Sequence, residues 1–171
     1  MKPILLATDG SLSAEAATRE AIDLARAFGA PLIVVSVAQT VLPAFGAYYG
    51  YTELAAELSK SEAEHVAQTL ATVRARASAV GVECETVALE GSPAGAEICR
   101  FAQEQSPRLV VVGAHGWGPL GRILHGSVST HVLHHAPCPV LVVLGETLDA
   151  DAITSMNGTA GTAVAGDSMR G

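Results

Sequence analysis

Short runs of apolar residues alternate along this chain with longer segments in which apolar positions recur every three or four residues. The short runs are almost continuously apolar, which is typical of strands that are covered on both faces in a parallel sheet. The run at 82–89 alternates only in part, so we expect an edge strand with one wetter face. The runs predict five strands, at 3–8, 32–38, 82–89, 109–113 and 140–144.

The segments with helical periodicity lie between these strands. Either Ser11 or Ser13 can cap the first helix, and Gly29 can end it because glycine tolerates the left-handed conformation found there. The third helix is expected to begin at Ser92 and Pro93, with the serine hydroxyl as the cap and proline in the first turn. The periodicity predicts helices at 12–29, 52–80, 93–106 and 127–136.

Strands that alternate with helices predict right-handed βαβ units. The expected fold is therefore α/β, a single doubly wound, mostly parallel, five-stranded sheet with helices on both faces, similar to a Rossmann fold. Residues 1–145 are expected to form this domain. Residues 146–171 are rich in small and polar residues and lack periodicity, so we expect a flexible acidic tail.

Composition excludes several classes of protein. The chain has 171 residues, of which 49% are hydrophobic and 16% charged, which is enough apolar material for a core and excludes wholesale disorder. The net charge is −7, so binding to nucleic acid or to an anionic membrane surface is not expected. Aromatic residues make up only 4%, which argues against stacking on single-stranded nucleic acid.

The distribution of apolar residues and cysteines bears on location. No stretch approaches the ~18 uninterrupted apolar residues of a transmembrane helix. The apolar run near the N-terminus is too short for a signal peptide, and Asp9 interrupts it. Cys84, Cys99 and Cys138 are odd in number and lack CxxC spacing, so we interpret them as buried thiols in a reducing compartment. The cytoplasm is the expected location.

A glycine-rich loop at 113–126 follows a predicted buried strand and leads into a predicted helix. In an open α/β sheet, ligands bind at the carboxyl ends of the strands, where such loops lie. The amides of Ser127, Val128 and Ser129 at the start of that helix could bind phosphate, and the two serine hydroxyls could add hydrogen bonds. A surface loop before an ordinary capped helix is the alternative, and these observations alone leave both open.

The segment 116–121 matches the GxGxxG pattern literally. A dinucleotide-binding fingerprint should open a helix at once and be followed by an acidic residue roughly 20 positions later. Here Pro119 and Gly121 belong to a loop that continues to Gly126. We therefore disfavour dinucleotide binding.

A different spacing fits better. The pattern Gly113-x2-Gly116-x9-Gly126-Ser127 resembles the ATP-binding signature of the universal stress protein family. The resemblance covers residues 3–144 with the order of elements intact. Four further segments are similar to those of the family. They are the opening strand and acidic turn (4–11), the strand and loop around the glycines (110–116), the helix after the loop (126–132) and the closing strand (138–143).

The resemblance implies an ATP site, commonly with a divalent cation such as Mg²⁺. Ala7 and Asp9 would lie beside the nucleoside, and Val37 would contact adenine through its main chain. Val112 and Gly113 would border the ribose and the α-phosphate. The residues implied around the phosphates are Gly116, Gly126, Ser127, Val128 and Ser129.

The resemblance also implies a homodimer in which the last strands, 140–144, pair across a two-fold axis. The physical argument agrees, because a bare apolar edge strand invites aggregation and pairing removes the edge. We expect a positive φ at Gly126, so that valine there would be strained and would crowd the phosphates.

Several polar residues carry alternatives. Asp9 could bind a ribose hydroxyl or a metal, or it could cap the first helix or close a turn. His115 and His125 flank the glycine loop and are most simply surface residues. Three histidines on one short helix near Cys138 could suggest zinc, which we disfavour because two of them point in different directions; they are His131, His134 and His135.

Three functions follow from these features. The leading hypothesis is a cytoplasmic ATP-binding regulator that responds to nucleotide in the stress response. The alternative is a slow ATP hydrolase or a self-phosphorylating enzyme, but Arg122 is the only cation in the glycine loop and no Walker lysine is present. The third is an interaction module with an empty pocket. No catalytic residue and no metal ligand are assigned.

Overall fold

The computed structural model describes residues 1–38, 52–114 and 126–145. The predicted tail at 146–171 and much of the glycine loop lie outside the described residues. The elements follow one another as β1 (Ile4–Ala7), α1 (Leu12–Phe28), β2 (Leu32–Ala38), α3 (Thr52–Ala79), β3 (Cys84–Glu90), α4 (Ala94–Gln105), β4 (Leu109–Gly113), α5 (Ser127–His135) and β5 (Val140–Val143).

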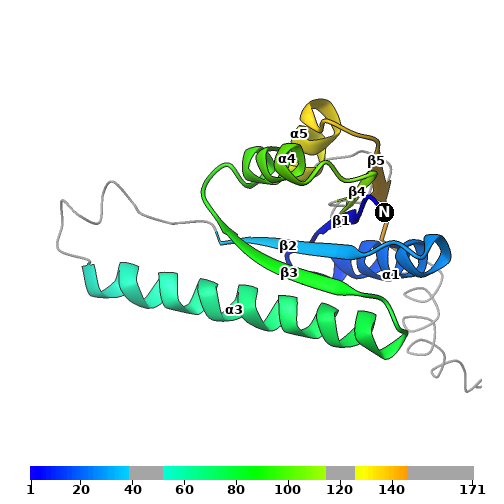
Figure 1. Cartoon of the computed structure of the whole chain (residues 1–171). Helices are drawn as coiled ribbons and strands as arrows, with labels where there is room; N and C mark the ends of the chain where they lie inside the picture. The colour runs from blue at the N-terminus through cyan, green and yellow to red at the C-terminus, as the bar shows by residue number, and fades with distance from the viewer. Residues whose placement is uncertain (39–51, 115–125, 146–171) are drawn as a thin grey trace, which may run out of the picture.

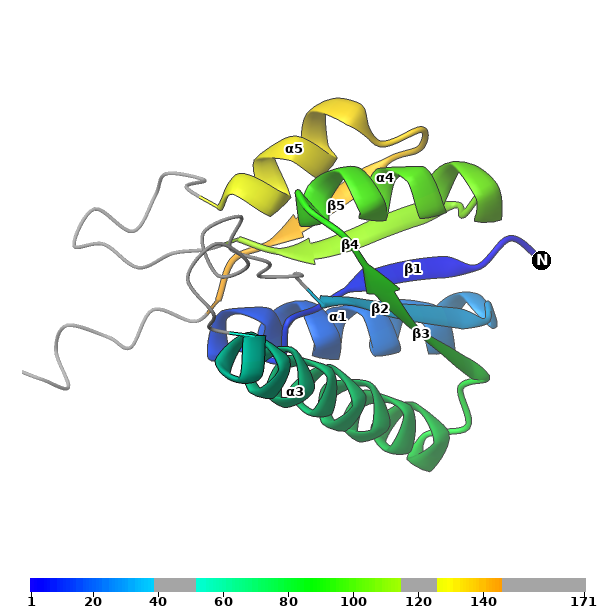
Figure 2. The same cartoon turned by 90° about the vertical axis from the view of Figure 1, so that its left-hand side faces the viewer.

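The five strands form one sheet in the order β3-β2-β1-β4-β5, and every pairing is parallel. β1 lies at the centre, where Ile4 is opposite both Leu32 of β2 and Leu109 of β4. The chain first builds the sheet outward from β1 to β3 and then returns to the other side of β1 for β4 and β5 (Figures 1 and 2). The predicted doubly wound α/β fold is confirmed, with its topological switch point between β1 and β4.

Helices cover both faces of the sheet. In Figure 2, α4 and α5 lie on one side of the strands, and α1 and α3 lie on the other. Alternate residues of β1 serve the two layers: Ile4 and Leu6 pack towards α1 and α3, whereas Leu5 and Ala7 pack towards α4 and α5. This double burial explains why the strand is continuously apolar in sequence.

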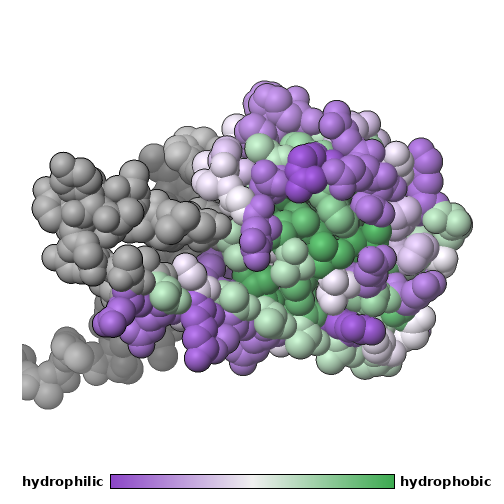
Figure 3. Space-filling view, turned by 60° about the vertical axis from the view of Figure 1, so that its left-hand side comes forward, coloured by the Kyte–Doolittle hydropathy of each residue, from purple (hydrophilic) through white to green (hydrophobic). Residues whose placement is uncertain are grey.

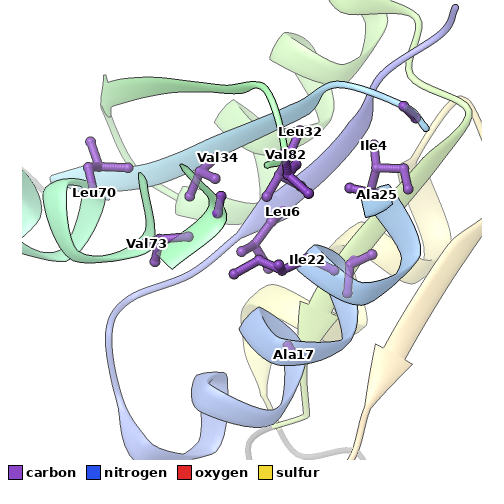
Figure 4. Close-up of a cluster of buried hydrophobic side chains, with 14 of the residues drawn as sticks. Ile4, Leu6, Ala17, Ile22, Ala25, Leu32, Val34, Leu70, Val73 and Val82 are labelled. Carbon is purple, nitrogen blue, oxygen red and sulfur yellow. The ribbon is translucent and has the colours of Figure 1, made fainter. Parts of the chain in front are cut away.

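The layer under α1 and α3 is drawn in Figure 4. Ile22 from α1 and Val73 from α3 converge there on Leu6 and Val34 of the central strands. Leu6 and Val34 are fully buried. Burying a side chain of this size contributes about 1.5–3 kcal/mol, so this layer holds both helices firmly against the sheet.

The two edge strands differ from the central ones. β3 mixes half-buried and exposed residues and buries only Leu89, in line with the partial alternation of its sequence. Figure 3 views the molecule from the side of β3, where hydrophobic residues gather between hydrophilic ones. At the other edge, all four residues of β5 are half-buried.

The helix ends test the predicted capping residues. Ser11 caps α1, because its hydroxyl accepts a hydrogen bond from the Ala14 amide at 3.3 Å, and Gly29 ends the helix in the left-handed conformation. The prediction that Ser92 caps the third helix is wrong. Pro93 occupies the capping position with extended φ and ψ, so α4 begins one residue later and has no side-chain cap.

Candidate functional site

A cavity of about 380 Å³ opens at the carboxyl ends of β1, β2 and β4. It lies at the topological switch point, where open α/β sheets bind their ligands. The first turns of α1, α4 and α5 also reach it. Its lining residues are Ala7, Thr8, Asp9, Ser11, Ala14, Val35, Val37, Ala94, Ile98, Val112, Gly113, Gly126, Ser127, Val128 and Ser129.

Every nucleotide-contacting residue implied by the sequence and described by the structure lines this one cavity. They come from four separate segments of the chain: Ala7 and Asp9, Val37, Val112 and Gly113, and the run from Gly126 to Ser129. Gly116 lies outside the described residues, as do His115, His125 and the GxGxxG segment. The topology therefore brings together four segments that are far apart in the sequence.

The inner wall of the cavity is apolar. Val35, in the middle of β2, is fully buried, and Val112 of β4 and Ala7 of β1 are almost as deeply buried. Ala94 and Ile98 of α4 face them across the cavity. Apolar walls with a few polar groups at the rim are typical of sites that bind small organic molecules.

The rim next to α5 has the features of an anion site. α5 begins at Ser127, and its N-cap residue Gly126 contributes no side-chain hydrogen bond. The first hydrogen bond of the helix runs from the Thr130 amide to the Gly126 carbonyl at 3.0 Å. The amides of Ser127, Val128 and Ser129 precede it, so they have no partner within the helix and lie where the helix dipole is positive.

Two expectations about this rim need correction. The φ of Gly126 is −76°, which any residue adopts, so a valine there would not be strained by its backbone. The hydroxyl of Ser129 is buried and donates to the Gly126 carbonyl at 3.1 Å, so its proton is already used inside the helix. Ser127 is exposed and keeps its hydroxyl at the cavity rim.

The turn after β1 carries the one charged side chain among the described residues that line the cavity, Asp9. Its Oδ1 accepts a hydrogen bond from the Ser11 amide at 3.0 Å, and Thr8 Oγ1 accepts one from the Gly10 amide at 3.2 Å. The predicted alternative that Asp9 closes a turn is therefore seen in the structure. The same carboxylate borders the cavity, so the turn holds a negative group at the rim.

Histidines and cysteines do not form a metal centre in the described part of the chain. The rings of His131 and His135 stack at 4.2 Å, and no group of three histidine, cysteine or acidic residues there could hold a metal ion. The three cysteines are free, but the prediction that all are buried holds only for Cys99, because Cys84 and Cys138 are half-buried. Burial raises the pKa of each thiol above its usual value, which favours the protonated thiol over the thiolate.

The residues that sequence reasoning missed are mostly apolar. Val35, Ala94 and Ile98 line the cavity, but in sequence they are ordinary members of a buried strand or of a helical stripe. Thr8 and Ser11 also line the cavity beside Asp9; both belong to the segment 4–11 that carries the family resemblance, but sequence reasoning assigned neither a role in binding. No helix among residues 1–38, 52–114 and 126–145 is long and apolar enough to cross a membrane.

The fold and the cavity define an α/β protein with a candidate ligand site at the sheet's switch point. Comparison with known proteins is consistent with that class: residues 1–143 match the model of the universal stress protein family. The chain belongs to the universal stress protein family. It is 41% identical over 146 residues to the universal stress protein MJ0531 of Methanocaldococcus jannaschii, covering 83% of this chain and 81% of that protein.

Solved structures agree. The universal stress protein UspA from Lactobacillus plantarum superimposes with a TM-score of 0.71 at 25% identity, covering 83% of this chain and 97% of that one. A universal stress protein from Archaeoglobus fulgidus in complex with dAMP is 28% identical with a TM-score of 0.56, covering 83% and 97%. A universal stress protein solved in complex with cAMP is 26% identical with a TM-score of 0.63, covering 85% of this chain and 98% of that one.

Proposed function

We propose that this universal stress protein binds ATP with Mg²⁺ in the switch-point cavity and acts as a cytoplasmic, nucleotide-responsive regulator in the stress response. The observation that carries the proposal is the cavity itself, because one apolar wall, one carboxylate and one uncapped helix N-terminus meet in it. These three features match the base, the sugar and the phosphates of a nucleotide. The dAMP and cAMP complexes of related proteins support an adenine nucleotide as the ligand.

Each part of the nucleotide has a proposed partner. Adenine lies against the apolar wall and accepts or donates hydrogen bonds at the main chain of Val37, and Ala7 packs beside it. The ribose hydroxyls need hydrogen-bond acceptors, and the Asp9 carboxylate at the rim accepts from them. Val112 and Gly113 border the α-phosphate. The remaining phosphates are bound by Gly116, Gly126, Ser127, Val128 and Ser129, where main-chain amides supply the donors.

Mg²⁺ is proposed to be held chiefly by the phosphates and by water. Magnesium commonly uses only one or two protein carboxylates when it accompanies a polyphosphate. The described residues contain no group of three metal-ligating side chains, and the one carboxylate at the cavity rim, Asp9, is assigned to the ribose. When bound, the cation would neutralise phosphate charge that the net-acidic chain would otherwise repel.

Binding is favoured over efficient catalysis. Fast phosphoryl transfer needs cationic groups that stabilise the charge of the transition state. No lysine or arginine is found among the described residues that line the cavity, and Arg122 of the glycine loop lies outside them. A regulator that changes conformation or assembly with bound nucleotide needs no such groups. Slow hydrolysis or self-phosphorylation is the second candidate.

We also propose that two copies pair through β5. β5 is an edge strand with a partner only at β4 among the described strands, and its residues are half-buried rather than covered. Leu144, just beyond it, is 66% exposed. A second copy of the strand would satisfy the open edge and cover these side chains.

The decisive experiment is mass spectrometry of small molecules released from freshly purified protein, followed by calorimetric titration with ATP, ADP and AMP in the presence of Mg²⁺. Co-purified adenine nucleotide, or micromolar binding, is expected. An empty protein that binds none of the three nucleotides would overturn the proposal. Turnover at millimolar ATP, compared between the wild type and a Gly126→Val variant, separates a regulator from a slow hydrolase.

A further inference from the structure

The turn that carries Asp9 is contacted from behind by α3. His65 Nε2 lies 2.9 Å from the main-chain oxygen of Asp9, across 56 residues of sequence. A carbonyl oxygen only accepts hydrogen bonds, so the ring nitrogen is the donor and carries a proton in either the neutral or the charged form of the ring. One turn further along α3, Thr69 packs against Gly10, whose φ is +74°.

His65 does not belong to the nucleotide cavity. It lines a second hollow on the α3 side of the turn, together with Ser36 and Glu62. The two hollows share Asp9, Ser11 and Val37, so the turn and the end of β2 stand between them. His65 contacts the main chain of the turn, so its hydrogen bond bears on where that turn lies.

We propose that His65 is a positioning residue for nucleotide binding, holding the Asp9 carboxylate at the cavity rim through the Asp9 carbonyl. This inference rests on the proposed function. The local hydrogen bonds of the turn, to Asp9 Oδ1 and Thr8 Oγ1, fix its internal shape. The Thr8 amide donates to the Val35 carbonyl at 3.0 Å and ties the start of the turn to the sheet, whereas the bond from His65 ties the turn to α3.

The hydrogen bond does not depend on the charge of the ring. The acidic groups near His65 are Glu62 from its own helix and Asp9 from the turn, while β2 presents only Ser36 and Val37 to the same hollow. Both protonation states of the ring keep a proton on Nε2 while it donates to the carbonyl. The role is therefore one of geometry, and a neutral donor of similar reach should replace it.

The test is calorimetric titration of the full chain with ATP and Mg²⁺ for the wild type, His65→Ala and His65→Gln. His65→Ala should weaken binding about 3- to 10-fold, the range for one hydrogen bond lost. His65→Gln, whose amide reaches a similar distance, should bind within about twofold of the wild type. Gln68→Ala, which alters an exposed side chain on the same helix, is the matched control and should leave affinity unchanged.

A double-mutant cycle shows whether His65 acts through Asp9. In an Asp9→Ala background, His65→Ala should change affinity by less than about twofold, because the carboxylate it positions is gone. Equal losses in both backgrounds would mean direct contact with the ligand and would overturn the inference. So would a His65→Ala protein that binds ATP as tightly as the wild type.

Amide hydrogen exchange in the nucleotide-free protein measures the turn alone. The Gly10 and Ser11 amides should exchange faster in His65→Ala and recover in His65→Gln. Unchanged exchange in His65→Ala would also overturn the inference. If the wild type binds no nucleotide while exchange responds to His65, the proposed function fails and the role of His65 in holding the turn stands.

Discussion

Replacing Gly10 by alanine should destabilise the protein through two separable effects. The φ of Gly10 is +74°, and a residue with a side chain pays about 1–2 kcal/mol in this left-handed region. The added Cβ would also lie 2.5 Å from Thr69 Oγ1 and 3.2 Å from Thr69 Cγ2. Thr69 is 8% exposed and cannot swing into solvent, so overpacking should add about 1–3 kcal/mol.

The two effects can be measured apart because the chain offers a matched glycine. Gly81 has φ +77° and nothing within 4 Å of its added Cβ, so Gly81→Ala should cost only the backbone part. Urea unfolding should therefore give a loss of about 1–2 kcal/mol for Gly81→Ala and about 2–5 kcal/mol for Gly10→Ala. In a Thr69→Ala background, the cost of Gly10→Ala should fall towards that of Gly81→Ala.

The reasoning about close packing fails if Gly10→Ala costs no more than Gly81→Ala. It fails equally if Thr69→Ala does not relieve the extra cost. Either result would show that α3 and the Asp9 turn are not packed as tightly as their contact distances indicate.

Three further predictions concern the proposed nucleotide site and the proposed dimer. Gly126→Val should abolish ATP binding in calorimetry, because the added side chain would crowd the phosphates. Its thermal unfolding should stay near that of the wild type, because the φ at this position is unstrained. Unaltered ATP affinity would contradict this prediction. Ser127→Ala should weaken ATP binding by about 0.5–1.5 kcal/mol, one hydrogen bond's worth, with little change in stability because the side chain is exposed. Val142→Lys, with folding checked by circular dichroism, should yield monomer or aggregate in light scattering, and an unchanged dimer would exclude β5 as the interface.

The fold could be predicted because each strand and helix has its own signal. The continuous apolar run of β1 reflects burial on two faces, and the structure shows Leu5 and Leu6 in opposite layers. The start of α4 could not be predicted in the same way. A serine followed by proline fits a capped helix start, but here Pro93 itself takes the capping position.

The cavity was predictable where glycines and a carboxylate mark the chain, and hidden where side chains are apolar. Ile98 lines the cavity and also belongs to the core beneath α4. Both positions favour an apolar residue, so the sequence alone does not distinguish a cavity wall from the core. His65 was missed for a different reason. It meets Asp9 only because α3 packs beside the β1 turn, and no local pattern connects residues 56 positions apart.

Because the residues of β1 alternate between two layers, the position of the Asp9 carboxylate at the end of this strand depends on how the interior packs. A slip of this strand by one residue would exchange the contents of both layers, and it would carry Asp9 about 3.3 Å along the sheet. Side chains that never meet a ligand, such as Ile4 and Leu5, therefore set how far the carboxylate stands from the amides of α5. Substitutions that loosen either layer should emerge in functional screens as weakened ligand capture before the molecule as a whole unfolds.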